Sequence, residues 1–259
     1  MARGEDPSPL PAEWPEIVRT IRARTPARLL VGRAGAAYRT DTLLELRQAH
    51  ADARDAVDDE LDLHAAFGPA FIASWKPLEL RTRARTKLEY LLRPDLGRQF
   101  DEASRAELRA GSRGGVDWQV AIGDGLSVRA VEAQIPALLP LIVSGGAARG
   151  WKLGPLLVIH HCRVGILNEI GELADPRVTV LLIGERPGLA TAESLSAYMA
   201  YRPRPGHSDA DRNLVSNIHR RGLRPADAAD RILDFAAQMM AVGRSGYLLR
   251  ADLPPPHPF

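Results

Sequence analysis

The 259-residue chain contains little of what marks several large classes of protein. Its single cysteine, Cys162, excludes an internal disulfide framework and any zinc or iron–sulfur site that needs several cysteines. Its longest apolar run covers residues 135–143, whereas a membrane-spanning helix needs roughly 20 residues. The first residues, MARGEDPSPLP, have no apolar core of the kind that a secretory signal requires. We therefore expect a cytoplasmic chain that does not use a membrane as a partner.

Lysine is also scarce, because the 34 basic side chains include only Lys76, Lys87 and Lys152 and the other 31 are arginines. Arginine favours bidentate binding of phosphate, so nucleic acid has to be considered as a partner. The chain also has 32 acidic residues, and they are interleaved with the arginines, as in RQAHADARD, to leave a net charge of +2. A nucleic-acid-binding surface usually clusters charge of one sign. The pattern favours solvated, salt-bridged faces, and we expect no nucleic acid.

The N-terminal part of the chain shows helical periodicity. Apolar spacing predicts helices over residues 13–24, 40–57 and 101–110. Thr42 and Glu45 have the spacing of a capping box at the start of the second helix. The glycines of GSRGG, residues 111–115, mark a boundary. We therefore divide the chain into a mostly helical region, 1–112, and a second domain, 113–259.

The second domain alternates between short β-rich runs and helical patterns. Such alternation indicates βαβ units and a mainly parallel sheet flanked by helices, which is an α/β fold. Strands are predicted over residues 116–122, 155–161 and 177–183. Helices are predicted over residues 128–133, 136–143, 166–173, 193–200 and 225–242.

Two glycine-containing loops follow predicted strands, where an open parallel sheet binds its ligands. The first, GDGLS at 123–127, is half of a dinucleotide fingerprint, since Val128 stands at the third glycine position. It is either a ligand contact or a tight turn in which Asp124 or Ser127 caps the next helix. In the second, GERPGL at 184–189, Glu185 could accept hydrogen bonds from amide groups of a ligand. The alternative is a surface arrangement of Glu185 with Arg186.

The chain shows no recognisable catalytic set. It has no G-x-S-x-G elbow, no P-loop and no H-E-x-x-H motif. His160, His161 and Cys162 run together at the end of a predicted strand. Neighbouring strand residues point to opposite faces, so the three side chains cannot converge on one ion. We predict neither catalytic residues nor a metal site on this chain.

Eight sequence strings, in order, cover about residues 20–245 and together resemble one known family. The chain is similar to the small (light) subunit of ethanolamine ammonia-lyase. The strings are TPARLLVGRAG (25–35), AHADARDAV (49–57), LRPDLGR (92–98), DGLS (124–127), IGEL (170–173), IGERPGL (183–189), SLSAY (194–198) and VSNIH (215–219).

This resemblance implies a subunit of an adenosylcobalamin enzyme that converts ethanolamine to acetaldehyde and ammonia by radical rearrangement. It implies that a large subunit carries the groups that react with substrate, and that the two subunits assemble as a hetero-oligomer of large–small pairs. The small subunit would have a Rossmann-like domain that closes over the cobalamin at the subunit interface. Entry of the complex into a bacterial microcompartment stays open.

The resemblance also carries three cobalamin contacts over to Val164, Glu185 and Leu214. Family members can have cysteine at the position of Leu214, so this chain departs from them there. An apolar corrin fringed with amide groups suits two apolar side chains and one carboxylate acceptor. The alternative is a non-enzymatic, Rossmann-like nucleotide- or cofactor-binding module that uses the GDGLS and GERPG loops.

Overall fold

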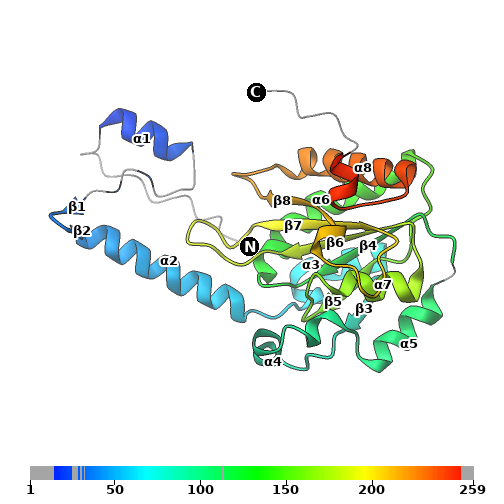
Figure 1. The fold of residues 1–259 in the computed structure, drawn as a ribbon. Helices are drawn as coiled ribbons and strands as arrows, with labels where there is room; N and C mark the ends of the chain where they lie inside the picture. Colours follow the sequence, from blue (N-terminus) through cyan, green and yellow to red (C-terminus); the bar gives the residue numbers. More distant parts are fainter. Residues whose placement is uncertain (1–14, 25–28, 30, 32, 113, 252–259) are drawn as a thin grey trace.

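A computed structural model describes residues 15–24, 29, 31, 33–112 and 114–251 (Figure 1). Its centre is a six-stranded mixed sheet with the strand order β3-β5-β4-β6-β7-β8. Neighbouring strands from β3 to β6 run parallel, whereas β7 and β8 are antiparallel additions at one edge. The strands are β3 (Leu78–Arg81), β4 (Trp118–Gly123), β5 (Leu157–His160), β6 (Val178–Gly184), β7 (Leu195–Tyr201) and β8 (Asn213–Ile218).

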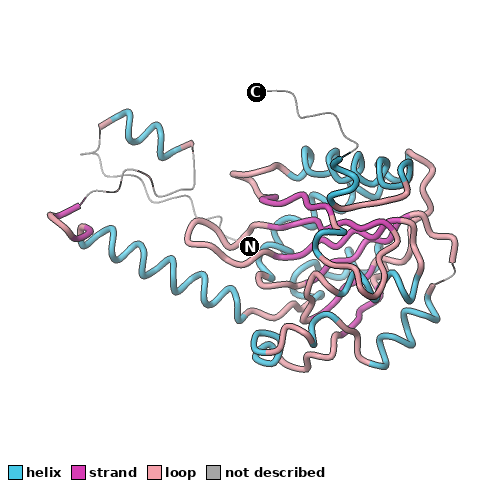
Figure 2. The backbone as a smooth tube through the Cα atoms, in the orientation of Figure 1, coloured by secondary structure: helices cyan, strands magenta, loops and turns pink. Residues whose placement is uncertain are grey.

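The expected α/β architecture, a sheet flanked by helices, is confirmed (Figure 2). The predicted strands at 116–122, 155–161 and 177–183 correspond to β4, β5 and β6. Every residue of these three strands is buried, since helices cover both faces of the parallel part. Burial on both sides is why their sequences are continuous apolar runs and were recognisable as strands.

The helix predicted over residues 193–200 is wrong, because this segment is strand β7. It pairs with β6 along its whole length, from Leu195 opposite Gly184 to Tyr201 opposite Val178. Leu, Ala and Met in the segment favour a helix in isolation, but strand pairing and burial outweigh that preference. Strands β3 and β8 were not predicted either. Residues 78–81 nevertheless join the sheet beside β5, although they come from the N-terminal region.

One face of the sheet is covered by α6 (Val128–Ala148) and α8 (Pro225–Val242), which pack against each other and against β6 and β7. Two helices were predicted within α6, but the chain forms one. Pro136 and Pro140 lie on its exposed side, while Ile135 and its neighbours on the other side are buried in the core. The buried stripe holds the helix together despite two missing backbone donors.

Helix α6 is also the one helix, among the described residues, with the length and apolarity to cross a membrane. Its buried side chains belong to the main core, with those of the sheet and α8. Its apolar composition is therefore that of a central core helix.

The other face carries α5 (Glu102–Gly111) and α7 (Ile166–Ala174), which enclose a second core against β3, β5 and β6. These helices, like α8, match their predicted positions within one residue. The remaining elements around the sheet are α3 (Leu63–Trp75), α4 (Lys87–Leu92), the 3-10 turns η1 (Leu96–Arg98) and η2 (Asp209–Asp211), and α9 (Tyr247–Ala251).

The N-terminal elements are α1 (Glu16–Ala23), the short hairpin β1–β2 (Arg33–Ala34 and Ala37–Tyr38) and α2 (Thr40–Asp58). Helix α2 extends away from the sheet (Figure 1). The predicted capping box is wrong, because the helix begins at Thr40 with Arg39 as its N-cap and Thr42 lies inside the first turn. Residues 13–14 of the first predicted helix, and the domain ends 1–14 and 252–259, lie outside the described residues.

Candidate functional site

Val164 lies in the turn between β5 and α7, at the carboxyl edge of the parallel strands. Its side chain is half-buried and packs against the second core. The turn is fixed by Asp124, which is only 1% exposed. The Asp124 carboxylate accepts hydrogen bonds from the backbone N–H groups of His161 and Cys162, both at 2.8 Å. A buried carboxylate with backbone donors therefore positions the segment that carries Val164.

The GDGLS loop is a capped turn that packs on the GERPG loop. Ser127 is the N-cap of α6, and its hydroxyl accepts from the Ala130 N–H at 3.3 Å. A Cβ atom at Gly125 would collide with the carbonyl oxygen of Gly184. The glycine at position 125 is therefore explained by close loop packing and by its positive φ of 60°. Of the two interpretations of this loop, the helix cap is confirmed.

Glu185 follows β6 at the same edge and accepts hydrogen bonds from two other strands of the sheet. Its carboxylate accepts hydrogen bonds from the Ser194 hydroxyl at 2.8 Å, from the Ser196 hydroxyl, and from the Asn217 backbone N–H at 3.1 Å. The half-buried side chain thus connects the end of β6, the start of β7 and the end of β8. A carboxylate has about four acceptor positions, so one remains for a ligand donor.

Leu214 lies on β8, directly opposite Tyr198 of β7. Alternation along β8 buries Asn213 and Val215, whereas Leu214 is 37% exposed. Val215 packs in the main core with α8, so Leu214 faces the opposite side of the sheet. An apolar side chain at this exposure on the open face of an edge strand is available for contact.

Tyr198 connects the three predicted residues and was missed in the sequence. It is half-buried, packs with Val164 against the second core, and pairs with Leu214. Burial raises the pKa of the Tyr198 hydroxyl, and the carboxylates of Asp209 and Glu185 raise it further. The wrong helix prediction hid this residue. Five of the seven residues of LSAYMAY are buried, so the segment shows no alternation that would have marked a strand, and only pairing with β6 and β8 places Tyr198 opposite Leu214.

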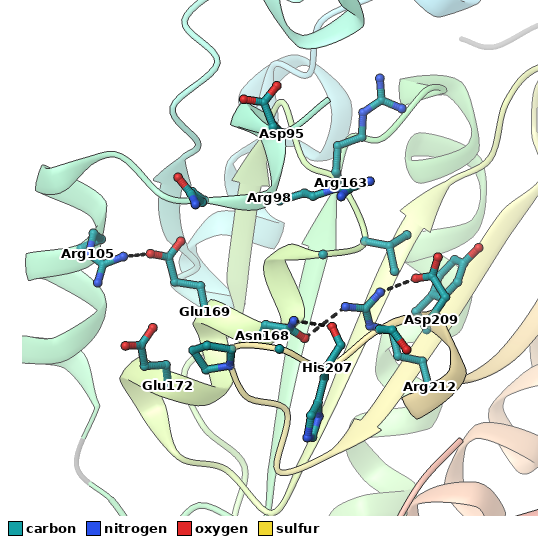
Figure 3. A pocket seen from close by; sticks show the side chains of 17 residues that line it. Asp95, Arg98, Arg105, Arg163, Asn168, Glu169, Glu172, His207, Asp209 and Arg212 are labelled. Atoms are coloured by element: carbon teal, nitrogen blue, oxygen red, sulfur yellow. Dashed lines mark hydrogen bonds and ion pairs between the residues drawn. The ribbon is translucent and has the colours of Figure 1, made fainter. Parts of the chain in front are cut away.

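A cleft of about 900 Å³ opens beside Val164 and Tyr198 (Figure 3). Its walls come from η1, α5, α7, β7 and the loop between β7 and β8. That loop is held on α7 by two hydrogen bonds: Asn168 Nδ2 donates to the His207 carbonyl at 2.8 Å, and Arg212 donates to Asn168 Oδ1 at 3.1 Å. The volume lies within the range of small-molecule sites. Charged residues dominate its lining, among them Asp95, Arg98, Arg105, Arg163, Glu169, Glu172, Asp209 and Arg212.

The His-His-Cys run has separate partners for each side chain. His160 Nε2 lies 2.7 Å from Glu79 Oε1, and His161 Nδ1 lies 2.9 Å from the Ala84 carbonyl oxygen. Cys162 is buried, and its burial raises the pKa of the thiol. Within the described ranges, no group of three His, Cys, Asp or Glu side chains is arranged to hold a metal ion.

Comparisons with known proteins agree on one family. The family model for "Ethanolamine ammonia-lyase light chain (EutC)" matches residues 15–250. A protein of Rhodopseudomonas palustris named ethanolamine ammonia-lyase small subunit is 42% identical over 235 residues, which is 91% of this chain and 90% of the relative. Proteins of the same name from Xanthomonas campestris and Clostridium acetobutylicum are 41% and 39% identical, over 81% and 95% of their own lengths. The chain therefore belongs to the family of ethanolamine ammonia-lyase light chains.

Proposed function

We propose that this chain is the small subunit of an adenosylcobalamin-dependent ethanolamine ammonia-lyase and forms one side of its cobalamin site. The observation that carries the proposal is the position of Tyr198, which lies opposite Leu214, packs against the same core as Val164, and is two residues from Ser196, whose hydroxyl donates to Glu185. Val164, Glu185 and Leu214 come from three separate segments, and of the three Val164 lines the cleft, together with Tyr198.

The residues fit a corrin by their chemistry. Leu214 and Val164 offer apolar contact to a broad ring, and Glu185 keeps one free acceptor position for an amide N–H of the ring's side chains. Adenosylcobalamin, when bound, supplies the radical chemistry that amino-acid side chains lack. The part of this chain is to bind the cofactor, orient it and exclude water from one side.

We assign no catalytic residue to this chain and place the substrate-reacting groups on the large subunit. The carboxylate of Glu185 is occupied by three donors from its own sheet, and the GDGLS loop is closed by packing on Gly184. The name of its relatives, small subunit, implies such a partner. Val164, Glu185 and Leu214 therefore act as binding residues in this proposal.

The N-terminal region, 1–112, is our candidate for the contact with the large subunit. Helix α2 extends from the sheet, and Leu43 and Leu44 on it are exposed, as is Tyr38 just before it in the chain. Exposed apolar side chains grouped on a projecting element mark a protein interface.

Residues 113–259, with β3 added from the first region, would then be the Rossmann-like domain that meets the cofactor. We place the assembled hetero-oligomer in the cytoplasm, with a bacterial microcompartment as the alternative.

Reconstitution tests this proposal. Purified chain, large subunit and adenosylcobalamin are mixed in all combinations, and acetaldehyde formed from ethanolamine is measured. We expect turnover only when all three are present. Full activity of the isolated chain with the cofactor would contradict the division of labour. Tight binding of nucleotides to the isolated chain, measured by titration calorimetry, would favour the non-enzymatic module instead.

A further inference from the structure

The cleft beside Val164 has an excess of positive charge at one end. Of its four arginines, Arg105 forms an ion pair with Glu169. Arg212 forms one with Asp209. Asp95, which also lines the cleft, is bound by Arg93 at 2.7 Å. Arg98 and Arg163 form no ion pair with any carboxylate in the described part of the chain, so their charges remain available.

These two arginines lie next to each other at the start of α7. The Arg163 N–H donates to the Gly97 carbonyl at 2.8 Å, and Gly97 adjoins Arg98 in the chain. The side chain of Arg98 rests against Gly165, the N-cap of α7, where a Cβ atom would come within 2.8 Å of Arg98 Cγ. The remaining acid of the cleft, Glu172, lies a turn beyond Glu169 toward the other end of the helix (Figure 3). The helix N-terminus adds a partial positive charge at the same place.

The head groups of Arg163 and Arg212 are held in position, and each has one nitrogen atom without a hydrogen-bond partner in the described chain. The Arg163 guanidinium lies over the Tyr90 ring at 4.1 Å and donates to the Tyr90 carbonyl at 3.1 Å. Its Nε is buried and has no hydrogen-bond partner among the described residues. Across the cleft, Arg212 has a side chain only 6% exposed, and its Nε is likewise without a partner there. The same holds for Nδ1 of His207.

Three buried nitrogen atoms around this one cleft have no partner in the described chain, so an acceptor bound in the cleft would satisfy donors that the protein leaves unpaired. Buried polar groups are almost always hydrogen-bonded in folded proteins, because leaving them unpaired costs free energy. Guanidinium groups and a helix N-terminus together select an oxyanion, and phosphate is the anion whose geometry arginine matches best. The apolar surface of Val164 and Tyr198 continues into the cleft, so an anion here would belong to a ligand that also covers that surface.

We propose that this cleft holds the phosphodiester of the nucleotide tail of cobalamin, with Arg98 and Arg163 as its charged donors. The inference rests on the proposed function and extends it, since Val164, Glu185 and Leu214 would contact the ring while the cleft takes the anionic tail. It adds Arg98 and Arg163 to the binding residues and gives the arginine-rich cleft a role in selecting corrinoids that carry a complete tail.

The test compares two corrinoids in the assembled complex of small and large subunits. Adenosylcobalamin carries the phosphodiester and the nucleotide, whereas adenosylcobinamide lacks them. Affinities are measured by equilibrium dialysis for the wild type, Arg98→Gln, Arg98→Lys and the control Arg231→Gln. Arg98 is exposed, so its loss leaves the core intact, and Arg231 is an exposed arginine on α8 across the sheet.

We expect Arg98→Gln to lower the affinity for adenosylcobalamin about tenfold, because one charge-assisted contact is lost. The affinity for adenosylcobinamide should stay unchanged. Arg98→Lys should retain most of the affinity, and Arg231→Gln should bind both corrinoids like the wild type. Inorganic phosphate should compete with adenosylcobalamin in the wild type and less in Arg98→Gln, with no effect on adenosylcobinamide.

Equal losses for both corrinoids in Arg98→Gln, or none for either, would overturn the inference. So would equal competition by phosphate in both proteins, which would place a free-phosphate site elsewhere. If the wild type bound adenosylcobinamide as tightly as adenosylcobalamin, the tail contact would be refuted while the proposed function stood. If the wild-type complex bound neither corrinoid, the proposed function itself would fail.

Discussion

The backbone N–H of Asn217 donates a 3.1 Å hydrogen bond to Oε1 of Glu185, which links the end of β8 to the end of β6. Asn217 has a positive φ of 60° at this point. The same carboxylate accepts from Ser194 and Ser196, so three donors converge on one side chain. Glu185 is therefore a structural support of the candidate site as well as one of its predicted contacts.

Replacing Glu185 should lower the stability of the fold even when no ligand is bound. Glu185→Ala leaves the buried Ser196 hydroxyl and two other donors without their acceptor, and we expect a loss of about 2–3 kcal/mol in the free energy of unfolding. Glu185→Gln keeps one acceptor oxygen and should lose less. Urea denaturation measures both, with the exposed Glu193→Ala as the control. Unchanged midpoints in both variants would show that the three hydrogen bonds contribute nothing.

Leu214 should matter for the cofactor and little for the fold. Leu214→Asp places a charge on a surface that we assign to the corrin, and we expect cobalamin affinity in the complex to fall at least tenfold. Leu214→Cys should bind nearly as well as the wild type. Val242→Asp, another exposed apolar position, serves as the control in the same dialysis experiment. Equal affinity of Leu214→Asp and the wild type would remove Leu214 from the site.

Asp124 should be among the most sensitive polar positions of the chain. Its two oxygens accept from three backbone N–H groups, those of Gly125, His161 and Cys162. Asp124→Asn turns one acceptor into a donor that faces an N–H, and we expect a loss of about 2–4 kcal/mol in the free energy of unfolding. Denaturation followed by circular dichroism measures it, with the exposed Asp230→Asn on α8 as a control. A loss no larger than that of the control would contradict the role given to Asp124.

Acidic conditions should weaken the fold through His219. Burial lowers the pKa of this imidazole from its ordinary value of 6.5. Nε2 contacts Asn217 Oδ1 at 2.8 Å and Nδ1 accepts from the Arg221 N–H at 3.2 Å, so the neutral ring fits. Below pH 6.5 the unfolded chain binds a proton here that the folded chain does not, and stability therefore falls as the pH falls.

Comparing unfolding free energies at pH 7.5 and 5.5 tests the effect of His219. We expect the wild type to lose about 1 kcal/mol more than His219→Gln over this interval. Because His219 forms a hydrogen bond with Asn217, lowering the pH should also weaken the contacts at the end of β8, next to Glu185. Parallel pH profiles of the two proteins would rule this histidine out as the source.

The exposed leucines of α2 should be needed for assembly. Leu44 is 56% exposed, and Leu44→Glu leaves the isolated chain folded while it places a charge in the proposed interface. We expect weaker association with the large subunit, measured by analytical ultracentrifugation. His50→Glu, which adds the same charge at an exposed position of the same helix, is the control. If both variants assembled like the wild type, α2 would not be the contact.

The chain's own sequence determined the buried parallel strands and the long amphipathic helices. Strands β4, β5 and β6 are apolar runs because both of their faces are covered, and α8 has a proline at its first turn and Gly243 just after its end. These signals are local and need no partner to be recognised. The family strings were local as well, and the match over residues 15–250 agrees with them.

Only the tertiary structure decided the identity of β7 and with it the surroundings of the candidate site. LSAYMAY prefers a helix by composition, and its pairing with β6 turns it into a strand that places Tyr198 opposite Leu214 and against the core that Val164 also contacts. The three donors on Glu185 and the paired and unpaired arginines of the cleft come from segments far apart in the chain. Long-range pairing fixes such contacts, and a single sequence holds no local signal for them.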